Sequence, residues 1–301
     1  MSAEPAPREL PDAELAELEE RVEHALESGD ESGLAVLGYG EISLVLAWPP
    51  QAPRFACKRL PPFPDRARFE RYRRTLADYV AALRASGVRA VESELRGVGR
   101  RDGTIAGYVV QPALDPATLA TAVLAAAEPD RGHPLPAAVV AAAAGAVGPR
   151  LGIDAQLSNW TWRDGELRYL DVTTPMLWSA AGEPELDVAL IVRPLPWALR
   201  GPVRRFLAPR ILDGYRRLRG VYFDLCGNLI KERLEAWLPA FLELVNARLD
   251  EPMSAEQVRS YYRSDARLWS LLLALRRLDR TWQRRIRRRP YPFLLPGRIE
   301  R

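Results

Sequence analysis

The first third of the chain carries two different hydrophobic periods. Between residues 11 and 30, apolar side chains recur every three or four positions among glutamates, which predicts an amphipathic helix. From Leu34 to Leu60 the pattern becomes that of short strands separated by turns. We expect the helix to pack by its apolar face, on these strands or on a partner, with its acidic face in solvent. Its apolar positions are Leu15, Leu18, Val22 and Leu26.

A second helix and two further strands are predicted before residue 111. Apolar residues at helical spacing mark a helix from Asp65 to Ser86. Strands follow at Val91–Val98 and Ile105–Val110, joined by a turn at Arg101–Gly103. Together with the predicted strands at 34–37, 43–48 and 55–60, they complete a five-stranded antiparallel sheet.

Most of the remaining sequence has helical periodicity. We predict helices at Ala117–Ala127 and Pro136–Val147, and a helical region over 185–290 with breaks at proline and glycine. The fold class is therefore α+β. We divide the chain into an acidic N-terminal extension with a helix (1–33), a part with the sheet and one helix (34–111), and a largely helical part (112–301).

One hairpin interrupts the helical part. Trp160–Trp162 has the aromatic and β-branched composition of a strand, and Leu167–Leu170 is the predicted return strand. Between them stands Asp164-Gly165, which is typical of a two-residue hairpin turn. The sequence therefore predicts a β-hairpin whose register is fixed by this turn.

The register of this hairpin brings three oxygen-bearing side chains together. Counting from the turn, Trp160 pairs with Tyr169 and Asn159 with the next residue, so that Asn159 and Asp171 emerge at the open end. Asp154 lies in the loop that leads into the hairpin. Carboxylate and amide oxygens of this kind are ligands for Mg²⁺, with phosphate oxygens completing the shell. The alternative is that these side chains only form local backbone turns.

This spacing resembles the catalytic core of the protein-kinase-like fold, and most closely its aminoglycoside and choline phosphotransferase branch. The resemblance implies a two-lobed fold in which Asn159 and Asp171 hold Mg²⁺ and Asp154 orients or deprotonates the acceptor hydroxyl. It implies ATP as the phosphoryl donor and a small-molecule acceptor. The whole chain is also similar to a bacterial family of kinase-like proteins with no known substrate.

The N-terminal strands fit the same resemblance. Gly38 and Gly40 stand between two strands, where the family has a loop that covers the phosphates, although Ser43 replaces its third glycine. Lys58 lies on the third strand, where the family has a lysine that contacts the α- and β-phosphates. Because Lys58 and Lys231 are the only lysines in the chain, a lysine here indicates a need that arginine does not meet.

Two further assignments follow from the resemblance. The helix after the third strand should supply a carboxylate to Lys58, for which we predict Glu70, with Asp78 as the alternative. The inter-lobe hinge falls at 111–113 and should donate a backbone N–H to adenine. Because Pro112 has no N–H, the donor should be Gln111 or Ala113.

The chain departs from the family pattern in ways that favour a second hypothesis. Val172 and Thr173 follow Asp171 where Phe-Gly is common, and Gly152 stands where many kinases have a histidine that supports the catalytic loop. These departures, with the missing third glycine, favour a nucleotide-binding scaffold of the pseudokinase type. Polar candidates for the acceptor side are Tyr222, Asp224, Asn228 and Glu232.

Composition narrows the possibilities further. The chain has two histidines and two cysteines, Cys57 and Cys226, without metal-binding spacing. We therefore do not expect histidine-based catalysis or a zinc site. No apolar run is long enough to span a membrane and no secretory leader is recognisable, so we expect a cytoplasmic protein.

The net charge of +4 is unevenly distributed. Arg276–Arg289 reads as a basic helix with eight arginines and a single acid, Asp279. Such a helix could bind nucleic acid, an anionic membrane or an acidic substrate, or pack in solvent near the acidic N-terminal segment. A nucleic-acid-binding protein built on this helix is the third hypothesis.

Overall fold

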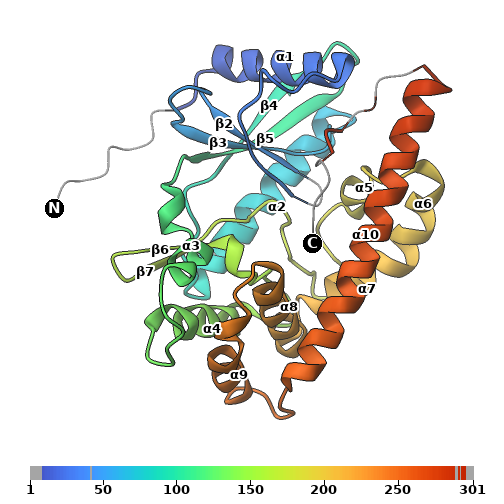
Figure 1. Ribbon diagram of the computed structural model, residues 1–301. Coiled ribbons are helices and arrows are strands. Elements are labelled where there is room, and N and C mark those ends of the chain that lie inside the picture. The colour runs from blue at the N-terminus through green and yellow to red at the C-terminus, as the bar shows by residue number, and fades with distance from the viewer. Residues whose placement is uncertain (1–8, 41–42, 289–290, 292, 296–301) are drawn as a thin grey trace. The chain divides into compact units, whose positions relative to one another are not determined.

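The computed structural model describes residues 9–40, 43–288, 291 and 293–295 (Figure 1). The chain forms two compact units, each discontinuous in sequence. Unit 1 consists of Met1–Arg73, Glu92–Leu114 and Arg276–Glu300, and unit 2 of Arg74–Val91, Asp115–Leu275 and Arg301.

Unit 1 is built on the predicted five-stranded antiparallel sheet, in the order β1-β2-β3-β5-β4. The sheet is confirmed, and its strand boundaries lie within a few residues of those predicted. Every neighbouring pair is antiparallel, and one bulge interrupts the β1–β2 register between Val36 and Gly38. The strands are β1 (Val36–Tyr39), β2 (Leu44–Trp48), β3 (Phe55–Arg59), β4 (Glu94–Gly99) and β5 (Ile105–Pro112).

The predicted N-terminal helix, α1 (Asp12–Ser28), covers one face of this sheet (Figure 1). Its apolar stripe joins alternate residues of β2, β3 and β5 in one buried core. Burial of this apolar surface is the main stabilising term of the unit. The strand residues that meet the helix are Leu44, Leu46, Trp48, Phe55, Cys57, Ala106, Tyr108 and Val110.

The other face of the sheet receives the beginning of α2 (Arg66–Ala85). Phe63, just before the helix, contacts Phe69 ring edge to face at 5.3 Å. The approach is possible because Gly97 and Gly107 pair across β4 and β5. A Cβ on Gly107 would lie 2.6 Å from the Phe63 ring, so that a side chain there would displace the aromatic cluster.

Unit 2 is largely helical, and the predicted hairpin is present in it as β6 (Trp160–Arg163) and β7 (Glu166–Tyr169). Its α-helices are α3 (Ala120–Ala125), α4 (Pro134–Ala146), α5 (Val188–Ile191), α6 (Trp197–Pro202), α7 (Ala208–Gly214), α8 (Leu218–Lys231), α9 (Leu238–Asn246) and the first part of α10 (Ala255–Arg285). Shorter turns are the 3₁₀ segments Pro116–Thr118, Leu157–Asn159 and Glu235–Trp237, and a π-helical turn at Val203–Leu207.

Two predicted helices differ from those observed. The region Ala117–Ala127 is divided, because Leu119 is extended between the 3₁₀ turn at Pro116–Thr118 and α3. The basic helix predicted at Arg276–Arg289 is the end of α10, which begins at Ala255 and ends at Arg285. Arg289 lies outside the described residues. No helix in the part of the chain that the structure describes is both long and apolar enough to cross a membrane.

Candidate functional site

The hairpin has the predicted register. Trp160 pairs with Tyr169, and beyond that pair the Leu170 N–H donates to the Asn159 carbonyl at 2.8 Å. Asp164 and Gly165 have φ angles of 53° and 79°, as a type I′ turn requires. Asp171 directly follows Leu170, so the register fixes its backbone close to that of Asn159.

Local hydrogen bonds shape the loop that carries Asp154. The Asn159 side-chain Nδ2 donates to the Asp154 carbonyl at 3.2 Å, and the Gln156 N–H donates to Asp154 Oδ1 at 3.1 Å. Trp160 Nε1 donates to the Ala155 carbonyl at 3.2 Å. The side-chain nitrogen of Asn159 donates to the loop, so the side-chain oxygen is the atom of this residue that can accept a hydrogen bond or bind a cation.

Asp171 is oriented by the residue two positions after it. Thr173 donates to Asp171 Oδ1 twice, from its backbone N–H at 3.2 Å and from its hydroxyl at 2.6 Å. Thr173 is buried at 2% exposure, so the hydroxyl sits in a fixed environment. The threonine that departs from the common Phe-Gly pair therefore holds the carboxylate of Asp171 in place.

The charges of Asp154 and Asp171 act on the same two buried tyrosines, Tyr79 and Tyr169. Burial raises the pKa of Tyr79 above its ordinary value, a hydrogen bond with Tyr169 opposes this, and the negative charges of Asp171 and Asp154 raise the pKa further. The pKa of Tyr169 is raised by burial first, then by Tyr79, Asp154 and Asp171. After burial, both carboxylates therefore contribute to the raised pKa values of the same pair of phenols.

Gly152 has a steric reason to be glycine. A Cβ at this position would lie 2.6 Å from the Tyr215 carbonyl oxygen and 3.0 Å from the Trp178 ring. The backbone here is also tied down, because Gly152 N–H donates to Met176 and Tyr79 OH donates to the Gly152 carbonyl. The helical part of unit 2 therefore supports the Asp154 loop through backbone contacts, in a place where a histidine would not fit.

A second polar cluster adjoins the Asp154 loop and includes Asp224 of α8, one of the predicted acceptor-side candidates. Gln156 Nε2 donates to Asp224 Oδ2 at 3.1 Å, and the Tyr261 hydroxyl donates to Oδ1 at 3.3 Å. Burial raises the pKa of Asp224 to about 6; Gln156 opposes the shift and the charge of Asp265 adds to it. Sequence reasoning missed Gln156 and Tyr261, although Gln156 stands only two residues after Asp154.

The remaining acceptor-side candidates differ in environment. Asn228 donates to the Asp224 carbonyl at 2.9 Å and belongs to the same cluster. The Tyr222 hydroxyl donates to the Val140 carbonyl at 3.0 Å, which is a packing role in the helical core. Glu232 directly follows α8, and its carboxylate lies 3.9 Å from the ammonium group of Lys231.

In unit 1, Lys58 and Gly38 stand in one row across the sheet. Gly38 pairs with Val45, Val45 with Lys58, and Lys58 with Val109. Residues directly opposite one another share a face of the sheet, so this row lies on the face away from α1. A Cβ on Gly38 would have nothing within 4 Å.

Gly40 lies at the end of β1, where its N–H donates to the Ser43 carbonyl at 2.9 Å. A Cβ on Gly40 would meet the Ser43 hydroxyl at 2.7 Å, so a side chain there would require this hydroxyl to turn away. The two residues between them, 41 and 42, lie outside the described residues.

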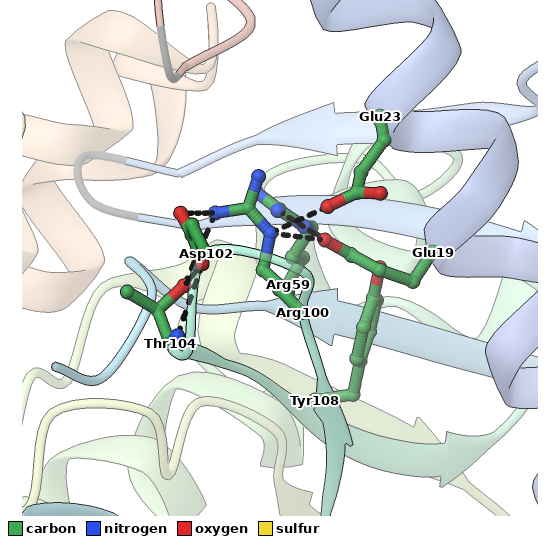
Figure 2. A network of polar contacts seen from close by, with 7 residues as sticks. All are labelled: Glu19, Glu23, Arg59, Arg100, Asp102, Thr104 and Tyr108. Atoms are coloured by element: carbon green, nitrogen blue, oxygen red, sulfur yellow. Dashed lines mark hydrogen bonds and ion pairs between the residues drawn. The ribbon is translucent and has the colours of Figure 1, made fainter. Parts of the chain in front are cut away.

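Next to Lys58, Arg59 points to the opposite face and forms a buried ion-pair network with α1 (Figure 2). Its Nε and Nη2 atoms donate to the two carboxylate oxygens of Glu19, each at 2.7 Å. The Tyr108 hydroxyl donates to Glu19, and Arg100 Nε donates to Glu23 at 2.7 Å. Burial alone would lower the pKa of Arg59, but Glu19 and Tyr108 raise it above its ordinary value.

This network corrects the expectation that the acidic residues of the first helix face solvent. Glu19 is only 2% exposed. The sequence contained a signal for this, because Glu19 lies four residues after Leu15 and three before Val22, on the apolar stripe itself. A carboxylate in that position needs a buried partner.

The residues predicted to form a hinge are held by hydrogen bonds within unit 1. The Ala113 N–H donates to the Arg54 carbonyl at 2.8 Å, which commits it to a bond within unit 1. Gln111 pairs with Ala56 of β3, and its side chain donates to Ser93 Oγ at 2.9 Å. N–H groups alternate in direction along an extended backbone, so we expect the Leu114 N–H on the side opposite to that of Ala113.

Glu70, the predicted partner of Lys58, interacts with arginines of its own helix. Arg66 and Arg73 each approach its carboxylate at 2.7 Å. The hydrogen bond from Arg73 is the first cause of the lowered pKa of Glu70. The alternative, Asp78, is exposed and belongs to unit 2.

The oxygen donors of the hairpin suit a hard cation. Two carboxylates and one amide oxygen, from Asp154, Asp171 and Asn159, form the kind of set that Mg²⁺ takes together with water and phosphate oxygens. Among the described residues, no group of three or more histidine, cysteine, aspartate or glutamate side chains is placed to hold a metal ion. A Mg²⁺ site at the hairpin would therefore need the amide oxygen of Asn159 as well as ligands from outside the protein.

These features define an α+β protein with a sheet-bearing unit and a helical unit whose hairpin carries a carboxylate–amide cluster. The chain belongs to a family of unknown function (DUF6206), whose profile matches residues 17–280. No curated protein matches the sequence. The match includes the hairpin, the Lys58 strand and most of α1 and α10.

Proposed function

We propose that this protein is an ATP- and Mg²⁺-dependent phosphotransferase of the protein-kinase-like fold, which acts on a hydroxyl of a small-molecule acceptor. The observation that carries the proposal is the pairing of Asn159 with Leu170. It sets Asn159 and Asp171 side by side at the end of the hairpin. The hydrogen bond from Asn159 to the Asp154 carbonyl adds the third residue to the same site.

In this proposal the named residues have separate roles. Asn159 and Asp171 hold Mg²⁺, which when bound neutralises charge on the phosphates. Asp154 accepts a hydrogen bond from the acceptor hydroxyl and takes its proton as the acceptor oxygen bonds to the γ-phosphorus of ATP; the bond from that phosphorus to the β,γ-bridging oxygen breaks, and ADP leaves. Lys58 contacts the nucleotide phosphates, and the backbone around Gly38 and Gly40 covers them. Catalysis is then mainly positioning and charge stabilisation.

The adenine contact is revised by the sheet hydrogen bonds. Because Ala113 N–H is committed to Arg54, and Gln111 pairs with Ala56 on the same side of the strand, we propose Leu114 as the backbone donor. Pro112 would offer its carbonyl on the same side, as an acceptor.

Calorimetric titration with ATP tests this function. We expect heat of binding that weakens when Mg²⁺ is chelated and weakens strongly in Asp171→Ala. Asp164→Asn, in the turn of the same hairpin and with a 91% exposed side chain, is the matched control and should bind as the wild type does. The absence of heat with ATP and with GTP, for protein with a cooperative melting transition, would refute the proposal.

A nucleotide-binding scaffold without catalysis is the second candidate, and the close contact between Gly152 and Tyr215 favours it. No side chain can be added at Gly152 to support the catalytic loop without moving backbone. Asp154→Asn separates the two candidates. In a phosphotransferase it should keep ATP binding and lower turnover by about 10²–10⁴-fold. A scaffold should bind ATP equally in both forms and show no turnover in either.

A further inference from the structure

The second half of α10 carries an exposed apolar stripe. Leu271, Leu278 and Ile286 are 57%, 66% and 70% exposed, and Trp282 is 37% exposed. The spacings of seven, four and four residues place all four side chains on one face of the helix. Ile286 keeps this register although the helix ends at Arg285, because its N–H donates to the Trp282 carbonyl at 3.0 Å.

Arginines flank this stripe. Residues 276–288 contain seven arginines and one acid, Asp279. Asp279 accepts a hydrogen bond from Gln283 at 3.2 Å, and the Arg287 guanidinium lies over the Trp282 ring at 5.2 Å from its centroid. The exposed arginines of the segment are Arg284, Arg285, Arg287 and Arg288. The surface around the stripe is therefore strongly positive.

We propose that this face of α10 binds the surface of an anionic phospholipid bilayer and lies in the plane of the interface. Apolar side chains enter the boundary between headgroups and acyl chains while arginines contact lipid phosphates. Arginine suits this position because its apolar stem can lie along the lipid while the guanidinium reaches the phosphates. The proposal is independent of the phosphotransferase function.

Two other occupants fit these residues less well. A second copy of the chain would bring the arginines of one helix against those of the other, and like charges repel. A nucleic acid would use the arginines and could stack on Trp282, but it offers no apolar environment for Leu278 and Ile286. Aliphatic residues with two thirds of their surface exposed favour a lipid surface.

Vesicle flotation of the full chain tests the proposal. We expect binding to phosphatidylcholine vesicles that contain phosphatidylglycerol and none to vesicles of phosphatidylcholine alone. Binding should be lost in about 1 M salt, where the screening length falls to about 3 Å. The double variant Leu278→Gln/Ile286→Gln should lower the partition coefficient at least about tenfold, because two inserted side chains are removed. Arg285→Gln/Arg287→Gln should weaken binding to anionic vesicles as well.

Phe206→Gln provides the matched control. Phe206 is 67% exposed and stands beside Arg204 and Arg205 in the π-helical turn, so its surroundings are chemically similar but lie on another element. It should keep full vesicle binding. Equal loss with Phe206→Gln, or no binding to anionic vesicles, would overturn the assignment to α10.

Two further results would replace the lipid with another partner. Sedimentation of the same variants measures self-association. Dimerisation of the wild type that is lost in Leu278→Gln/Ile286→Gln would identify a second copy as the occupant. Duplex DNA that displaces the protein from vesicles, and binds the double variant as well as the wild type, would identify nucleic acid. Circular dichroism checks that the variants keep their helix content, which is expected because all substituted side chains are exposed.

Discussion

Glu19 of α1 and Arg59 of β3 form a two-point ion pair in the interior of unit 1, with both hydrogen bonds at 2.7 Å. They are 2% and 6% exposed. The pair fixes the N-terminal helix on the sheet at the residue next to Lys58. A candidate phosphate-binding lysine is thus anchored through its neighbour on the opposite face of the strand.

Glu19→Ala should therefore destabilise the protein by about 3–5 kcal/mol, because it leaves Arg59 charged and buried without its main partner. Urea unfolding measures this change. The matched control is Glu17→Ala on the same helix, which removes an exposed ion pair with Arg21 and should cost less than about 1 kcal/mol. Similar losses in the two variants would mean that the buried pair does not stabilise the fold.

Gly152→Ala should displace the Asp154 loop. The added Cβ would lie 2.6 Å from the Tyr215 carbonyl oxygen, and overpacking of this kind costs about 1–3 kcal/mol. Thermal unfolding should show the loss, and any ATP turnover should fall with it. Gly148→Ala in the same loop, where a Cβ meets nothing within 4 Å, should change neither. An unchanged melting temperature for Gly152→Ala would show that the loop can adjust.

The pH dependence of stability should carry a contribution from Asp224. Burial raises its native pKa to about 6, above the unfolded value of about 4. The native state then binds the proton more tightly, so this contribution is complete below about pH 4 and is lost as the pH rises through about 6. The groups that act on Asp224 include Asp265, Lys231 and Tyr261.

Asp224→Asn should flatten this dependence, because the variant has no proton to lose. Urea unfolding at pH 4, 6 and 8 measures it, and the difference in slope should amount to on the order of 2 kcal/mol across the range. Asp164→Asn, in the exposed turn, should leave the slope unchanged. A slope in Asp224→Asn equal to that of the wild type would assign the pH dependence to other groups.

Lys58→Arg tests the proposed phosphate contact with the charge conserved. The melting temperature should stay unchanged, while Mg²⁺-ATP affinity or turnover falls, by roughly 10²-fold in rate, because a broad guanidinium displaces the phosphates. The other lysine offers the control: Lys231→Arg, at the end of α8, should affect neither quantity. Full nucleotide function in Lys58→Arg would remove Lys58 from the proposed site.

The sequence by itself determined the features that depend on local pattern. Asp164-Gly165 selects a two-residue turn, and the turn of a hairpin sets the register of every pair that follows it. The pairing of Asn159 with Leu170 could therefore be predicted by counting residues from the turn. The five-stranded sheet and α1 followed from their hydrophobic periods in the same way. These predictions needed only spacing along a few neighbouring residues.

Only the tertiary structure decided which distant groups meet. The contacts of Gln156 with Asp224, of Gly152 with the Tyr215 carbonyl and of Glu19 with Arg59 join segments far apart in the chain, and no local pattern specifies such partners. The same holds for α10. Its sequence is apolar at Leu271, Leu272 and Leu278 alike, yet Leu272 is buried and the other two are exposed. Hydrophobic periodicity shows that a helix has apolar positions, but packing of the surrounding chain determines which of them remain open to a partner.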